Sequence, residues 1–94
     1  MDKETYKAKA KKSIDDIFNK IDELEAKKDQ AQEGAKQKYT EKIEELKEKR
    51  NDLQLKYNEL VNATEEKWET AKTKFSESAD YFKKGFAELG NIFK

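Results

Sequence analysis

The chain has 94 residues, of which 45% are charged and 34% are hydrophobic. Its 21 basic and 21 acidic side chains cancel, so it lacks the basic excess with which a general nucleic-acid-binding protein displaces counterions from phosphates. It contains no His and no Cys, which removes the usual general base near neutral pH, thiolate nucleophiles and the commonest nitrogen and sulfur ligands of zinc. We therefore expect one non-catalytic domain over residues 1–94, with no cofactor, metal, nucleic-acid partner or small-molecule substrate.

Two kinds of targeting segment are not found in the sequence. Residues 1–7 lack the apolar core of a secretory signal peptide. No stretch approaches the roughly 20 apolar residues that a helix needs to cross a bilayer. We expect a cytoplasmic protein.

The first predicted element is a long helix that begins near residue 4, with Asp2 or Thr5 as its N-cap. Apolar side chains then recur at intervals of three and four, which places them on one narrow stripe of a helix. Such a stripe is typical of a coiled coil, whereas a disordered chain has no reason to keep the phase. The main members of this stripe are Ile14, Ile17, Ile21, Leu24, Ile43, Leu46, Leu53 and Leu60.

The phase of the stripe shifts between Lys28 and Tyr39, which are eleven residues apart. A continuous helix can absorb such a step as a stutter, but a turn can also produce it. Gly34 weakens a helix in this stretch, yet no Ser, Thr, Asn or Asp follows to cap a new one. We therefore favour an all-α, antiparallel coiled-coil hairpin in which the long helix covers about 4–61. The alternative is a three-helix bundle with an extra turn near Gly34.

A shorter return helix is predicted over about 64–90. Asn62, with Glu65 three residues later, resembles a capping box at its start. Gly90 and Asn91 can supply a left-handed C-cap at its end. This segment carries the aromatic part of the stripe, which comprises Trp68, Phe75, Phe82, Phe86, Leu89 and Phe93.

The carboxylates offer no clear catalytic pair, because neighbouring residues on a helix point in different directions. We interpret them, together with the basic cluster over 7–12, as solvated helix surface. The adjacent acidic pairs are Asp15-Asp16, Glu44-Glu45 and Glu65-Glu66.

The unequal helix lengths of the hairpin lead to a functional hypothesis. The long helix would measure about 87 Å and the return helix about 40 Å. The return helix would therefore leave the stripe from Ile14 to Leu24 exposed, and an exposed apolar stripe calls for a partner. The first hypothesis is a protein that self-associates or binds a helical partner, with the stripe residues given above as its interaction seam. The alternative is a protein that binds a lipid surface by inserting the aromatic C-terminal helix, with Lys83 and Lys84 kept in water.

The order of several short motifs points in the same direction. Ile21-Asp22-Glu23-Leu24 precedes an Ala- and Lys-rich stretch, Tyr39, the run Ile-Glu-Glu-Leu-Lys-Glu-Lys-Arg over 43–50, Leu60 and then Trp68-Glu69. This order resembles a group of short bacterial coiled-coil proteins that includes stress-associated members in cyanobacteria. The resemblance implies a cytoplasmic, non-catalytic helical protein induced under stress, oligomeric or lipid-associating. Members of this kind often have an Ala-rich segment without Gly where Gly34 stands, so the resemblance leaves a turn there open.

Overall fold

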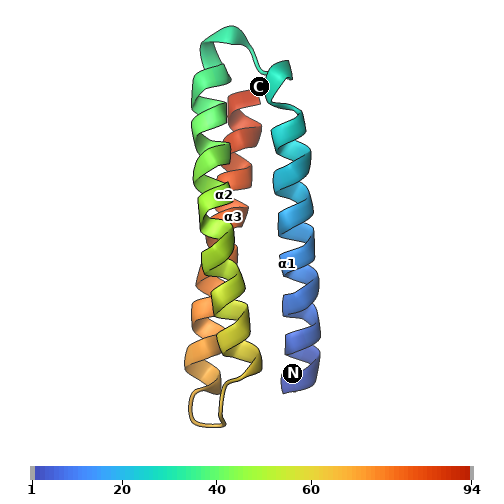
Figure 1. Cartoon of the computed structure of the whole chain (residues 1–94), viewed down its shortest axis with the longest axis vertical. Coiled ribbons are helices and arrows are strands. Elements are labelled where there is room, and N and C mark those ends of the chain that lie inside the picture. The colour runs from blue at the N-terminus through green and yellow to red at the C-terminus, as the bar shows by residue number, and fades with distance from the viewer. Residues whose placement is uncertain (1, 94) are drawn as a thin grey trace.

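The protein is an all-α bundle of three helices arranged up, down and up (Figure 1). The computed structural model describes residues 2–93, and side chains as far as Ile92. The helices are α1 (Lys3–Ala26), α2 (Glu33–Val61) and α3 (Trp68–Phe93), with a short 3-10 helix, η1 (Lys28–Gln30), between the first two. The bundle is a rod of 50 × 17 × 17 Å. Strands do not occur in the described part of the chain.

The predicted long helix over 4–61 is not confirmed, because the chain turns between α1 and α2. The helix ends at Ala26, and the backbone becomes extended at Ala31 and Gln32, where ψ is 148° for both. Gly34 lies in the first turn of α2 rather than in the connection. The helix count therefore fits the three-helix alternative. Folding α1 back covers an apolar stripe that the hairpin would leave in water, and this burial offsets the helical hydrogen bonds lost at the turn.

The ends of α1 and α2 are formed by local polar groups. The Asp2 carboxylate accepts a hydrogen bond from the Thr5 backbone N–H at 2.7 Å, which confirms Asp2 as a predicted N-cap. This bond stabilises the charged carboxylate and lowers the pKa of Asp2. At the end of α2, the Asn62 side-chain amide donates to the Asn58 carbonyl at 2.9 Å. Asn62 thus caps the end of α2, and the capping box predicted for it at the start of α3 is wrong.

The boundaries of α3 also differ from the prediction. The helix begins at Trp68 rather than near residue 64, and it continues through Gly90 and Asn91 to Phe93. No glycine in residues 2–93 has a positive φ, so the predicted left-handed C-cap at Gly90-Asn91 is wrong. Continuing the helix keeps Ile92 packed against the core, and this contact outweighs the weak helix propensity of Gly and Asn.

The core of the bundle is apolar throughout. Polar or charged residues are not found among the buried residues of the described chain. The largest completely buried side chains come from all three helices, and they are Tyr39, Phe82, Ile21, Ile43, Leu46, Leu53, Leu60 and Leu89. Among the described residues, no buried side-chain nitrogen or oxygen atom lacks a hydrogen-bond partner. The stability of the fold therefore rests mainly on apolar packing, without a penalty from unpaired buried polar groups.

Gly85 marks the closest approach of α3 to α2. A Cβ atom at this position would lie 2.7 Å from Leu46 Cδ2 and 3.3 Å from Leu46 Cδ1. We expect Gly85→Ala to lower the free energy of unfolding by about 1 kcal/mol, because overpacking costs more than the roughly 1 kcal/mol that helix propensity contributes. Gly90 has no atom within 4 Å of such a Cβ, so Gly90→Ala should raise stability slightly. Urea unfolding of both variants checks this, and equal stabilisation by both would contradict the close approach.

Candidate functional site

The predicted interaction seam forms the interior of the bundle. Leu24 and Phe86 are half-buried against the core, and the side chain of Phe93 lies outside the described residues. The stripe from Ile14 to Leu24, which the hairpin would expose, is covered by the other helices. The buried members of the seam are Ile14, Ile17, Ile21, Ile43, Leu46, Leu53, Leu60, Trp68, Phe75, Phe82 and Leu89.

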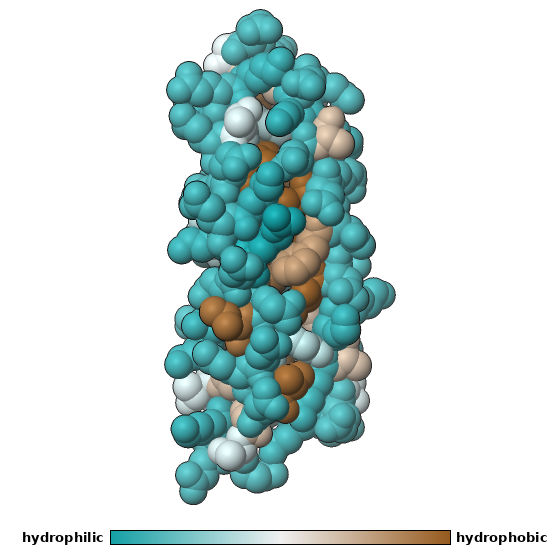
Figure 2. All heavy atoms as spheres, viewed as in Figure 1, coloured by the Kyte–Doolittle hydropathy of each residue, from teal (hydrophilic) through white to brown (hydrophobic). Residues whose placement is uncertain are grey.

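The outside of the bundle offers little apolar surface. Leu55, with 59% of its surface exposed, is the one large hydrophobic side chain classed as exposed within the described chain. Figure 2 shows a mostly hydrophilic face on which apolar side chains form separate patches between polar ones. A broad apolar surface for a partner would therefore require the helices to separate.

The interface between α1 and α2 combines the apolar stripe with a polar rim. Lys47 Nζ lies 2.7 Å from the Glu25 carboxylate, and Arg50 lies 3.7 Å from Asp22. The contact with Lys47 lowers the pKa of Glu25 and raises that of Lys47. These exposed pairs contribute little stability, but their fixed spacing sets the register of α1 on α2.

One buried hydroxyl group joins the same two helices near the turn. Tyr39 is completely buried, and its hydroxyl donates to the Leu24 backbone carbonyl at 2.6 Å. That carbonyl belongs to the last turn of α1, and it also accepts a hydrogen bond from the Lys27 backbone N–H at 3.2 Å. Burial raises the pKa of Tyr39. The side chain is therefore a neutral donor that holds the end of α1 on α2.

An aromatic cluster joins α1 to the start of α3. The Tyr6 and Trp68 rings meet edge to face with centroids 5.8 Å apart, and the Tyr6 hydroxyl is 3.0 Å from Ser76 Oγ. The ammonium groups of Lys3 and Lys7 lie 5.7 Å and 5.9 Å from the Trp68 ring. Lys3, and Lys7 from the basic cluster over 7–12, thus contact an aromatic ring of the same chain.

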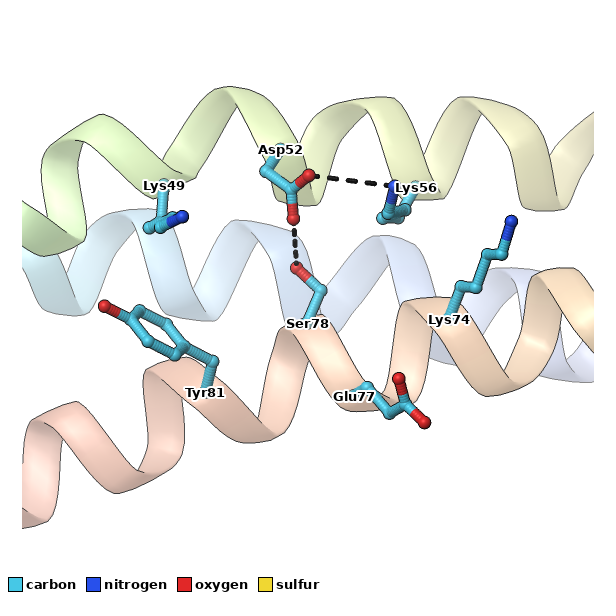
Figure 3. Close-up of a pocket in the computed structure, with 7 residues that line it drawn as sticks. All are labelled: Lys49, Asp52, Lys56, Lys74, Glu77, Ser78 and Tyr81. Atoms are coloured by element: carbon cyan, nitrogen blue, oxygen red, sulfur yellow. Dashed lines mark hydrogen bonds and ion pairs between the residues drawn. The ribbon is translucent and has the colours of Figure 1, made fainter.

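A shallow polar groove lies between α2 and α3 (Figure 3). Ser78 donates to Asp52 at 3.3 Å, and Asp52 also pairs with Lys56 at 3.7 Å. Nearby, the Tyr81 hydroxyl donates to Glu45 and lowers the pKa of that carboxylate. Burial, followed by this hydrogen bond, raises the pKa of Tyr81. Asp52 and Glu45 are thus each paired with a neighbouring side chain at the surface.

The acidic pairs singled out in the sequence all lie at the surface. Every residue of Asp15-Asp16, Glu44-Glu45 and Glu65-Glu66 is exposed, as the interpretation of a solvated face predicted. Within residues 2–93, no three His, Cys, Asp or Glu side chains are grouped so that they could hold a metal ion. The described helices include none that is both long and apolar enough to span a bilayer.

Comparisons with known proteins add no identification. No protein-family model, no curated protein and no solved structure matches the chain.

Some core positions were missed in the sequence. Tyr6 and Ala10 extend the stripe of α1 toward its N-terminus, with Ala10 buried and Tyr6 half-buried. Their spacing of four before Ile14 is a helical signal that predicts this extension. In contrast, the pairing of Tyr39 with the Leu24 carbonyl depends on the turn at 27–32, and no local pattern indicates it.

Proposed function

We propose that the chain is a non-catalytic protein that acts by helix exchange, in which an amphipathic helix from a second copy or another protein takes the place of α1. The observation that supports this proposal is the uneven packing of the bundle. The backbone of α3 lies close to that of α2, whereas α1 approaches α2 less closely and reaches α3 mainly through side chains such as Tyr6. The helix with the fewest contacts is the one that separates at the lowest free-energy cost.

The surface under α1 defines the chemistry of the partner. Release of α1 would uncover apolar side chains such as Phe86 and Leu89, which border a groove beside Leu24. It would also free Lys47 and Arg50 from Glu25 and Asp22. A fitting partner is therefore a helix with an apolar stripe and carboxylates along one edge. The α1 helix of a second copy meets both requirements.

Sedimentation of the full chain tests self-association. We expect the mass to rise from monomer toward dimer between micromolar and millimolar concentration, because exchange between copies follows mass action. Helicity should change little across this range, since the two states differ only in the few residues between α1 and α2. A monomer mass at every concentration would contradict self-association.

A second candidate function is binding to a lipid surface, and it is favoured by the composition of α3. This helix carries Trp68, Phe75 and Phe82 on its buried face, while Lys83 and Lys84 are exposed. Aromatic side chains on one face and lysines beside them are typical of helices that lie in a membrane interface. In the closed bundle the aromatic face is covered, so insertion requires the helices to separate.

Quenching of Trp68 by brominated lipid in anionic vesicles tests this second function. Trp68 is already buried in the bundle, with only 8% of its surface exposed. Its emission should therefore shift little on insertion, and quenching is the more sensitive measurement. We expect quenching with anionic vesicles and less with zwitterionic ones, because lysines near an anionic surface each contribute about 1 kcal/mol. Unquenched fluorescence in both would count against lipid binding. The cytoplasmic stress-response role implied by the resemblance stays a prediction.

A further inference from the structure

The connection between α1 and α2 lacks the residues that usually stabilise a turn. We call residues 27–32 the hinge. It contains neither Gly nor Pro, and Gln32 precedes α2 without a side-chain capping bond. Lys27 keeps α-region angles, with φ −91° and ψ 0°, and η1 follows it. Ala31 and Gln32 have extended backbone angles, so a change in ψ at few residues would straighten the chain into a helix.

The apolar stripe also continues through the hinge in helical phase. Leu24, Lys28, Ala31, Ala35 and Tyr39 follow one another at intervals of four, three, four and four residues. A turn between separate helices does not need this continuous spacing, whereas a single helix that crosses the region does. Such a helix can absorb the eleven-residue step between Lys28 and Tyr39 as a stutter.

We propose that two copies of the chain exchange α1 by straightening the hinge, so that α1 and α2 become one helix over 3–61 in each copy. Each α1 then occupies, on the other copy, the place that it holds on its own α2 and α3 in the closed bundle. This inference rests on the proposed function, and it identifies the partner as a second copy and residues 27–32 as the moving part.

The register of α1 on α2 fits a two-fold arrangement of the long helices. The ion pairs of Asp22 with Arg50 and of Glu25 with Lys47 are both symmetric about position 36. The hydrogen bond of Tyr39 with the Leu24 carbonyl is centred between residues 31 and 32. If the same pairs form between copies, the two long helices run antiparallel and cross between about residues 31 and 36. The neighbouring side chains Ala31, Gly34 and Ala35 are small, and small residues allow helices to approach closely where they cross.

The exchanged dimer keeps the contacts of the closed bundle, so the two states differ mainly at the hinge. Straightening adds helical hydrogen bonds at 27–32, while association lowers translational and rotational freedom. The balance therefore depends on concentration, and refolding at high concentration should favour the dimer.

Gln32→Pro is the variant that separates the two states. In the closed bundle Gln32 has φ −64° and Ala31 has ψ 148°, which are the values that proline and its preceding residue adopt. Within a straight helix the same proline would clash with the Lys28 carbonyl. We expect Gln32→Pro to weaken the dimer at least about a hundredfold without loss of helicity in the monomer. Gln32→Ala, which permits both states, should dimerise like the unmodified chain.

Thiol crosslinking identifies the arrangement of the dimer. The chain has no Cys, so Asp22→Cys with Arg50→Cys places two thiols on facing helices beside one known ion pair. A flexible bis-maleimide is used to join them, because the long Arg50 side chain spans the gap in the unmodified chain and a direct disulfide needs closer Cα atoms. After refolding at high concentration and crosslinking, we expect covalent dimers on a denaturing gel. With Gln32→Pro added, the same thiols should be joined within one chain.

The outcomes distinguish this inference from the proposed function. If Gln32→Pro dimerises as tightly as the unmodified chain and the crosslinks remain within one chain, exchange of α1 is overturned while self-association stands. If the unmodified chain stays monomeric after refolding at every concentration, exchange between copies and self-association are both overturned.

Discussion

Replacing Phe82 by Asp should unfold the bundle at neutral pH. Phe82 is completely buried, and its ring packs against those of Tyr81 and Phe86 with centroids 5.8 Å and 6.4 Å apart. The substitution removes a large apolar side chain and places a carboxylate in a core without polar residues, at a cost above about 4 kcal/mol. Far-ultraviolet circular dichroism should show most of the helical signal lost.

Ala87→Asp is the matched control for this variant. It lies on the same helix, changes the net charge equally, and alters an exposed position. We expect it to lower the free energy of unfolding by less than about 1 kcal/mol through helix propensity alone. A Phe82→Asp protein that remains as helical and as heat-resistant as Ala87→Asp would show that this face of α3 is not in the core.

Leu53 and Leu55 offer a second comparison, between two identical side chains on α2. Leu53 is completely buried, whereas 59% of Leu55 is exposed. Leu53→Ala should lower the free energy of unfolding by about 2–5 kcal/mol, because it removes apolar contacts and leaves a cavity. Leu55→Ala should change it by no more than about 0.5 kcal/mol.

Thermal unfolding of the two variants measures this difference. For a domain of this size, 1 kcal/mol shifts Tm by about 4–8 °C, so Leu53→Ala should melt at least about 6 °C below Leu55→Ala. Equally large losses of stability at both positions would mean that Leu55 is covered in solution, as in an oligomer that uses this surface. Equally small losses of stability would mean that Leu53 is not in a packed core.

The core could be predicted from the sequence because apolar periodicity is local information. Residues spaced by three and four share a face of a helix whatever the helix packs against. Ile21, Leu46 and Phe82 were therefore identified as buried positions before the direction of packing was known. Asp2 was predicted for the same reason, since an N-cap acts on the turn next to it.

The path of the chain could not be predicted in the same way. Residues 27–32 are good helix formers, and the turn there exists because α1 gains burial against the rest of the bundle. Gly34 and Gly90 suggested boundaries that the structure places elsewhere. In both cases tertiary packing outweighs a preference of a few tenths to about 1 kcal/mol.

The candidate site depended on this path. If one long helix is assumed, the stripe from Ile14 to Leu24 is exposed and indicates a partner. The turn at 27–32 instead covers that stripe within the chain. Self-association therefore requires the bundle to open, rather than following from a surface that is already exposed. Long-range pairs such as Tyr6 with Trp68 also appear only after the helices are placed.

The most direct test is a distance between α1 and α2 in the dilute, full-length chain. Lys12 and Glu59 are exposed and lie almost symmetrically about position 36, so spin labels on Cys at these positions should be less than about 30 Å apart in the closed bundle. An excess of unlabelled chain prevents pairs between copies from contributing to the signal. The total concentration, unlabelled chain included, is kept where sedimentation shows a monomer, because an exchanged dimer would also contain the straight helix. In the monomer, a distance near 70 Å, which one continuous helix would give at about 1.5 Å per residue, would contradict the closed bundle.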